Sequence, residues 1–216
     1  SLELDHELRA KAEHIMVFAS PYSSMEHNYC PHMHYEFKQN IQEMSGGRIY
    51  LDIQDNGTLG PGHELMAMVA RGAISAALVS VSNLTPAAPE LDILNIPFWS
   101  SQEQDYLNLI TSNTWKELIL DKVRSQGKFD VLFHYLPGSR TLSTTRTYNK
   151  TIKRPEHINE IMFRIPNGKA LKTFYQLAGT SAVNVDWGNV AYMAKLGRID
   201  AMDPGIIGLY NGPKGL

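Results

Sequence analysis

Residues 161–202 read IMFRIPNGKALKTFYQLAGTSAVNVDWGNVAYMAKLGRIDAM and alternate between two hydrophobic patterns. Short apolar runs predict strands, and apolar residues at helical spacing predict helices. The strands are expected at 161–166, 182–186 and 199–202, and the helices at 169–177 and 187–196. Strands joined by helices form parallel sheets with helices on both faces, so this stretch predicts an α/β fold.

The same alternation extends upstream, with strands expected at 14–20, 48–54, 74–81 and 130–136 and helices at 29–44, 63–71 and 101–127. An extended strand is expected at 140–147 and a polar helical turn at 153–160. The composition changes at Pro137–Gly138, where a stretch rich in threonine and serine begins, which predicts a first lobe at 11–137 and a second at 138–212. The chain stops among glycines at 210–216, so we expect the second lobe to be incomplete at its C-terminus.

Composition excludes several classes of protein. The 216 residues are 43% hydrophobic and 19% charged, which is typical of a globular chain long enough for two small lobes. A net charge of −2 provides no basic field for a polyanion, so no nucleic-acid partner is expected. No apolar run of about 18 residues occurs, so no insertion into a membrane is expected. The GxSxG, HExxH and Walker signatures are absent, and no cofactor is expected.

Metal binding also has little support in the sequence. Cys30 is the only cysteine, which excludes an internal disulfide and a cysteine-rich zinc site. His27, His32 and His34 lie close together, but no glutamate or cysteine stands at a recognised spacing from them. We interpret them as surface or helix-start histidines and predict no metal. The Gly-rich loop at 57–62 could turn its N–H groups toward an anion, but we favour a tight turn between strand and helix.

Arg164 is the most informative charged residue. It stands between Phe163 and Ile165 in a short apolar strand, where its guanidinium would be partly desolvated. Such a group needs an anionic partner, and a ligand carboxylate supplies two parallel hydrogen bonds to it. An internal salt bridge to Asp186 or Asp203 is an equal alternative. Trp187 opens the following helix, where it would either cap a ligand pocket or pack between lobes.

Six short motifs then occur in one family's order, at 45–49 (SGGRI) with 58–60, 66–76, 96–98 (IPF), 138–140 (GSR), 163–166 (FRIP) and 197–201 (GRIDA). Together they resemble the solute-binding subunits of tripartite ATP-independent periplasmic (TRAP) transporters, which bind C4-dicarboxylates and sialic acid. The resemblance implies a two-lobed periplasmic-binding-protein fold, each lobe a mostly parallel sheet flanked by helices, that closes on a ligand by a hinge.

The resemblance also implies roles for individual residues. The arginine of the FRIP motif, Arg164, would pair with a ligand carboxylate. The other implied contacts are Arg140 as a second cation, Asn167 as a hydrogen-bond donor, Trp187 as an aromatic surface, and Ser80, Ser20 and Tyr22 from the other wall. Asp203 and Pro204 depart from the usual family motif, so the usual asparagine contact is lost or replaced. Asp203 is a candidate contact and an alternative site for a metal-bridged ligand.

The resemblance therefore implies a periplasmic protein that captures a small organic acid between its lobes and delivers it to the permease subunits in the membrane, without chemistry. Two alternatives stay open. One is a two-lobed enzyme acting on an organic acid, although His134, Asp186 and Asp203 lack a positioned nucleophile partner in the sequence. The other is a ligand-sensing domain that reports to a receptor.

Overall fold

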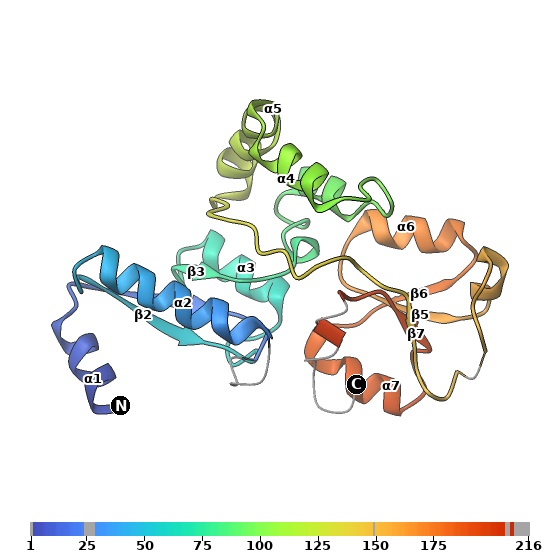
Figure 1. Ribbon diagram of the computed structural model, residues 1–216, viewed down its shortest axis with the longest axis horizontal. Helices are drawn as coiled ribbons and strands as arrows, with labels where there is room; N and C mark the ends of the chain where they lie inside the picture. The colour runs from blue at the N-terminus through green and yellow to red at the C-terminus, as the bar shows by residue number, and fades with distance from the viewer. Residues whose placement is uncertain (1, 24–28, 149, 206–207, 210–216) are drawn as a thin grey trace. The chain divides into compact units, whose positions relative to one another are not determined.

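The computed structural model describes residues 2–23, 29–148, 150–205 and 208–209. Close contacts divide the chain into two compact units, Ser1–Val79 and Ser80–Leu216, and each unit has its own sheet (Figure 1). The lobes predicted at 11–137 and 138–212 remain a prediction, because a unit defined by close contacts need not coincide with a lobe that moves as one body.

The first unit contains a parallel three-stranded sheet with the order β2-β1-β3. Its elements are α1 (Leu2–Lys11), β1 (His14–Ala19), α2 (Tyr29–Met44), β2 (Ile49–Gln54), α3 (Gly62–Ala70) and β3 (Ala76–Ala77). The predicted strands and helices are confirmed here, although the strand expected at 74–81 is reduced to the two residues of β3. Its ladder is short because the chain turns into a 3-10 helix, η1 (Val81–Asn83), soon afterwards.

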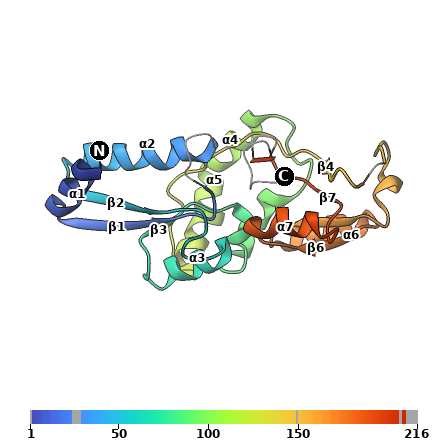
Figure 2. The ribbon, with the colours of Figure 1, turned by 90° about the horizontal axis from the view of Figure 1, so that it is seen from below.

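Two helices cover opposite faces of this sheet, as Figure 2 shows for α2 and α3. Alternation along β1 explains the arrangement, because successive side chains point to opposite faces. Phe18 faces α2, with its ring centroid 5.2 Å from that of Phe37. Ala19 is fully buried in the cluster on the α3 side together with Leu65 and Ile74.

The Gly-rich loop before α3 folds as a tight turn, which supports the favoured interpretation of residues 57–62. The amide of Gly60 donates to the carbonyl of Gly57 at 2.9 Å. Glu64, in the first turn of α3, lies against Gly60 so closely that a Cβ there would be 2.7 Å from the Glu64 Oε2 atom. A carboxylate of the protein therefore lies against this loop, which disfavours a bound anion there.

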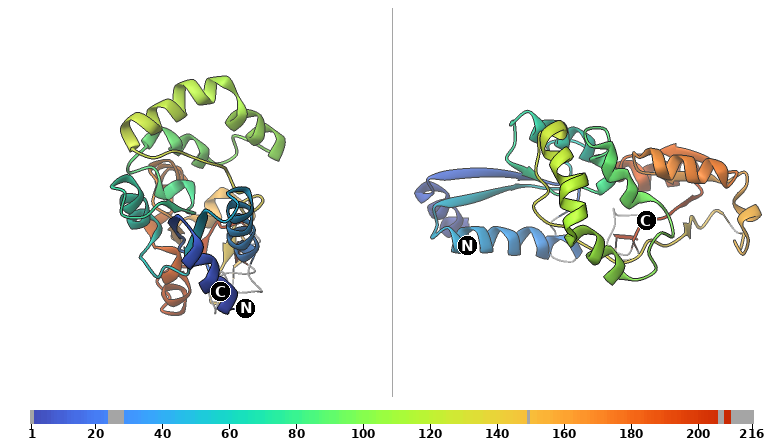
Figure 3. Two further views of the ribbon diagram at one scale, coloured as in Figure 1. Left: turned by 90° about the vertical axis from the view of Figure 1, so that its left-hand side faces the viewer. Right: turned by 90° about the horizontal axis from the view of Figure 1, so that it is seen from above.

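The second unit opens with helical segments: η1, η2 (Pro89–Asn95), α4 (Glu103–Thr111), α5 (Asn113–Trp115) and two π-helical turns, η3 (Lys116–Leu120) and η4 (Val123–Gly127). Figure 3 shows the segments from α4 onward as one run of helix with a break. The break lies at Ser112, whose Oγ accepts the Trp115 N–H at 3.0 Å and caps α5. The helical prediction for 101–127 is confirmed.

The strand predicted at 130–136 is wrong, since residues 129–139 are all described and form no strand. Lys128 adopts a left-handed conformation (φ 58°) that ends the helical run. The apolar and aromatic side chains that follow pack by their rings. Tyr106 and His134, for example, have ring centroids 5.9 Å apart in an edge-on contact. The apolar run is not buried either, since Leu132 is 67% and Phe133 43% exposed.

The second sheet has the order β4-β7-β5-β6, in which β5, β6 and β7 are parallel and only β4 is antiparallel. Its elements are β4 (Ser143–Thr144), η5 (Pro155–Ile158), β5 (Met162–Ile165), α6 (Lys169–Leu177), β6 (Ser181–Asn184), η6 (Trp187–Asn189), α7 (Val190–Lys195) and β7 (Ala201–Met202). The mostly parallel sheet is confirmed. The long strand expected at 140–147 is reduced to β4 and an isolated bridge between Arg140 and Gly205.

Helices α6 and α7 lie on opposite sides of this sheet (Figure 1), and we call the two sides the α6 face and the α7 face. On the α6 face Phe163 is fully buried, and its ring stacks on Tyr175 of α6 with centroids 3.9 Å apart. On the α7 face Met162 packs against the buried residues Val190 and Ile199. Arg164 alternates with Phe163, so its side chain belongs to the α7 face.

Candidate functional site

The second sheet brings four predicted site residues to one edge. Because β5, β6 and β7 are parallel, their carboxyl ends meet at the same edge, where α/β proteins bind ligands. Arg164 lies near the end of β5, Trp187 follows β6, and Asp203 follows β7. Arg140 joins them through its bridge with Gly205, just beyond Asp203.

Arg164 is only 5% exposed. Its Nε donates to the carbonyl oxygen of Val185 at 2.8 Å, and its Cζ lies 5.6 Å from the centroid of the Trp187 ring. Val185 is the first residue after β6, so this hydrogen bond carries the guanidinium to the carboxyl edge. The ring contact lies within the range of a cation–π interaction. Trp187 thus meets a charged side chain of the site, as well as packing against the α7 face.

Arg140 and Asp203 form a two-point ion pair beside Tyr175. Arg140 donates through Nη2 to Asp203 Oδ1 at 2.8 Å and through Nε to Oδ2 at 3.3 Å, and the Tyr175 hydroxyl donates to Oδ2 at 2.9 Å. The pKa of Tyr175 is raised mainly by burial and further by the nearby Asp203 carboxylate, so its hydroxyl stays protonated and donates. Asp203, which the sequence offered as a partner for Arg164, forms its ion pair with Arg140.

Asn167 and Ser80 lie on segments that a hydrogen-bond chain holds together. Asn167 is partly buried on the loop after β5, and a Cβ added at the next residue, Gly168, would lie 3.4 Å from Asp92 Oδ1 and 3.8 Å from Ser82 Cβ. The Asp92 carboxylate accepts the Ala170 N–H of α6 at 2.7 Å and the Asn95 side-chain amide at 2.9 Å. Asn95 in turn accepts the Ser82 hydroxyl at 3.0 Å. The start of α6 is therefore fixed to η1 and η2.

The hydroxyl of Ser80, directly before η1, accepts a hydrogen bond from the Asn83 side chain at 3.1 Å. Ser20 and Tyr22 belong to the first unit, where they follow the carboxyl end of β1. Ser20 is fully buried, and its hydroxyl accepts the Tyr22 N–H at 3.1 Å. These two serines thus shape their own loops, and their contact with a ligand stays a prediction.

Tyr175 is the site residue that sequence reasoning missed. Its position at helical spacing from Leu171 predicts only that it belongs to the core. A usable signal was its hydroxyl, because a buried tyrosine normally finds a hydrogen-bond partner. The partner, Asp203, is 28 residues away, and no local pattern identifies it.

Among the described residues, no group of three histidine, cysteine, aspartate or glutamate side chains is placed to hold a metal ion. Asp203, the candidate for a metal-bridged ligand, is hydrogen-bonded to Arg140 and Tyr175. His34 is buried beside Phe18, with ring centroids 5.5 Å apart. The side chains of Cys30, His27 and His32 lie outside the described residues.

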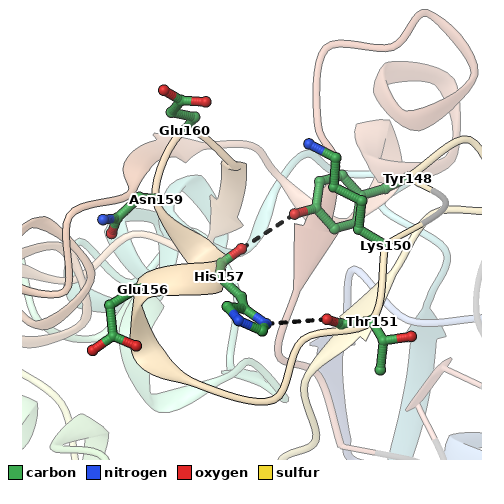
Figure 4. A pocket seen from close by; sticks show the side chains of 7 residues that line it. All are labelled: Tyr148, Lys150, Thr151, Glu156, His157, Asn159 and Glu160. Carbon is green, nitrogen blue, oxygen red and sulfur yellow. Dashed lines mark hydrogen bonds between the residues drawn. The ribbon is translucent and has the colours of Figure 1, made fainter.

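A surface hollow of about 520 Å³ lies elsewhere in the second unit (Figure 4). The Tyr148 hydroxyl donates to the His157 carbonyl at 3.2 Å, and the His157 Nδ1 lies 3.2 Å from the Thr151 carbonyl oxygen. These bonds join Tyr148 and Thr151 to His157, and none of the predicted site residues lines the hollow. The lining residues are Tyr148, Lys150, Thr151, Glu156, His157, Asn159 and Glu160.

The model of the bacterial extracellular solute-binding proteins of family 7 (DctP) matches residues 22–205. The chain belongs to this family. It is 21% identical to an uncharacterized protein of Haemophilus influenzae over 186 aligned residues. The aligned region covers 86% of this chain and 54% of that protein. The chain thus spans about half the length of this curated relative. None of the helices among the described residues is both long and apolar enough to cross a membrane.

Solved structures give the same fold. A TRAP periplasmic solute-binding protein from Sulfurospirillum deleyianum, with bound succinate, is 21% identical with a TM-score of 0.81, over 93% of this chain and 62% of that one. One from Roseobacter denitrificans, with bound L-galactonate, is 18% identical with a TM-score of 0.83, over 93% of this chain and 64% of that one. The predicted fold and the resemblance to TRAP solute-binding subunits are confirmed.

Proposed function

We propose that this solute-binding protein captures a small organic acid in the periplasm and delivers it to the permease subunits of a TRAP transporter, without changing the acid chemically. The observation that carries this proposal is the buried guanidinium of Arg164 at the carboxyl edge of the second sheet, beside Trp187. A planar guanidinium matches a carboxylate with two parallel hydrogen bonds.

The surroundings of Arg164 support an anion as the ligand. Arg164 is buried, and a ligand carboxylate in the same low-dielectric environment would interact strongly with its guanidinium. The Val185 carbonyl orients the guanidinium, and the Trp187 ring supplies an apolar surface against which the carbon chain of an acid would pack.

The solved relatives support the same class of ligand, since their bound molecules include succinate, L-galactonate and β-D-glucuronate, which are all organic acids. Arg164 would hold the acid group, and Arg140, Asn167 and Trp187 would surround the remainder. Ser80, Ser20 and Tyr22 remain predicted contacts. Ligand would favour a closed state by adding contacts that the open state lacks.

Isothermal titration calorimetry tests the proposal, after a thermal-shift screen with organic acids has found a binder. A ligand at 100 times its Kd adds about 2.7 kcal/mol of stability, which such a screen detects. We expect Arg164→Ala to raise the Kd at least about a hundredfold, because truncating one partner of a buried charge pair costs about 2–5 kcal/mol.

Arg146→Ala is the matched control, because this exposed arginine follows the antiparallel strand β4 and so lies at the edge of the sheet opposite the carboxyl ends of β5, β6 and β7. It should leave the Kd unchanged. An Arg164→Ala variant that binds the acid as tightly as the wild type would overturn the role of Arg164. Conversion of the bound acid, followed by mass spectrometry, would instead favour the enzyme alternative.

A further inference from the structure

The cluster of Arg140, Asp203 and Tyr175 is electrically balanced. The Asp203 carboxylate, whose side chain is 10% exposed, matches the single positive charge of Arg140 at two points. Tyr175 adds a neutral hydroxyl. Arg140 therefore brings hydrogen-bond donors to the carboxyl edge but no unmatched positive charge.

We propose that this cluster makes the site selective for acids that carry one carboxylate and several hydroxyl groups, and selects against dicarboxylates. The inference rests on the proposed function, in which Arg164 holds the carboxylate. The new element is that the end of the ligand away from the carboxylate would meet this charge-balanced cluster, where the remaining N–H groups of Arg140 suit hydroxyl oxygens.

The sheet brings the two arginines within reach of one small molecule. Arg164 of β5 pairs with Met202 of β7, and Asp203 is the next residue. Neighbouring strands lie about 4.8 Å apart, a distance that a six-carbon acid exceeds. Arg164 and Asp203 belong to opposite faces of the sheet, but both act at its carboxyl edge. Arg164 bonds to Val185, beyond β6, and Asp203 lies beyond β7.

The exposure of the cluster supports contact with a ligand. The Arg140 side chain is 45% exposed, and its Nη1 group makes neither of the hydrogen bonds to Asp203. Those N–H groups can donate to a neutral hydroxyl at no electrostatic cost. A second carboxylate placed there would also lie beside Asp203, and like charges at short range repel.

The test compares two acids with the same carbon number. D-Gluconate carries one carboxylate and D-glucarate carries two, and the Kd of each is measured by calorimetry on the full chain. We expect the wild type to prefer gluconate. Asp203→Asn removes the balancing charge but keeps an acceptor, so we expect the preference to shift toward glucarate at least tenfold, or about 1.4 kcal/mol.

Three further variants separate charge from structure. The double variant Arg140→Gln with Asp203→Asn restores the balance and should return the preference to within threefold of the wild type. Asp130→Asn breaks an exposed ion pair with Arg124 in the same unit and should leave the preference unchanged. Arg140→Gln alone leaves Asp203 without its cation and should weaken glucarate binding more than gluconate binding, which keeps the test decisive if Asp203→Asn fails to fold.

The outcomes distinguish this inference from the proposed function. A preference that Asp203→Asn and Arg140→Gln leave unchanged overturns the inference, while loss of binding in Arg164→Ala would still support acid capture. Wild-type protein that binds glucarate as tightly as gluconate, or binds neither, also overturns the inference. Gluconate binding that survives in Arg164→Ala contradicts the proposed function itself.

Discussion

The two faces of the second sheet use an arginine in different ways. On the α6 face Arg140 forms an ion pair with the Asp203 carboxylate, which also accepts a hydrogen bond from the Tyr175 hydroxyl. On the α7 face Arg164 is more deeply buried and contacts a backbone carbonyl and the ring of Trp187. The sequence presents both residues as candidate cations for one acid. The structure gives the two arginines different surroundings, and their roles toward a ligand remain predictions.

The largest expected effect comes from removing the packing under the α6 face. Phe163→Ala deletes a fully buried ring that stacks on Tyr175, which should lower the free energy of unfolding by about 3–5 kcal/mol. Urea unfolding measures the change. Leu177→Ala, at an 85% exposed position of α6, is the control and should change it by less than about 0.5 kcal/mol. Equal losses in the two variants would contradict the predicted role of this face.

A smaller effect is expected from the hydroxyl that supports Asp203. Tyr175→Phe keeps the stacked ring but removes a hydrogen bond to a buried carboxylate, which should cost about 1.5 kcal/mol in urea unfolding. Tyr148→Phe removes an exposed hydroxyl contact with the His157 carbonyl and should cost less than about 0.5 kcal/mol. A neutral Tyr175→Phe substitution would show that the Arg140 pair holds Asp203 without help.

On the α7 face, Trp187→Leu keeps an apolar side chain but loses the aromatic ring beside Arg164. Leucine removes the ring surface proposed to face the acid and the contact that helps to orient Arg164. If this loss costs the complex about 0.5–1 kcal/mol, the Kd for the acid should rise about threefold. Trp99→Leu changes an aromatic residue whose ring packs on that of Tyr106, and it should leave the Kd unchanged. If both variants lose the same affinity, the effect of Trp187 is not specific to the site.

The smallest expected effect is the pH dependence of stability that His134 contributes. Burial lowers the pKa of His134 from 6.5. At high pH the ring is neutral in both states, and below about pH 6.5 the unfolded chain takes up a proton that the folded chain resists. Stability should therefore fall as the pH decreases. Because the ring is only partly buried, we expect Tm to drop by about 1–2 °C from pH 7.5 to 5.5. His134→Gln should show a smaller drop, and an equal drop would assign the effect to other groups.

Local patterns predicted most of the helices and strands, and they predicted that Arg164 lies in an apolar strand. Helices α2 and α6 have their predicted bounds, because their apolar spacing and flanking glycines are local features. Arg164 was placed correctly in its strand for the same reason. The strand at 130–136 failed because an apolar run does not say whether its backbone will find a partner. The pairing of Arg140 with Asp203 spans 63 residues and depends on sheet register, which periodicity does not encode.

Asp92 has a consequence for how the site attracts its ligand. The amino end of a helix carries a partial positive charge, and α6 begins close to the carboxyl edge of the sheet. Asp92 already accepts a backbone N–H there, so the protein has supplied that helix with its own counter-ion. We therefore expect the end of α6 to add little attraction for an acid at the proposed site. Under the proposed function, ligand preference would then depend on the side chains at the strand ends, and Asp92 would hold α6 in place independently of the ligand.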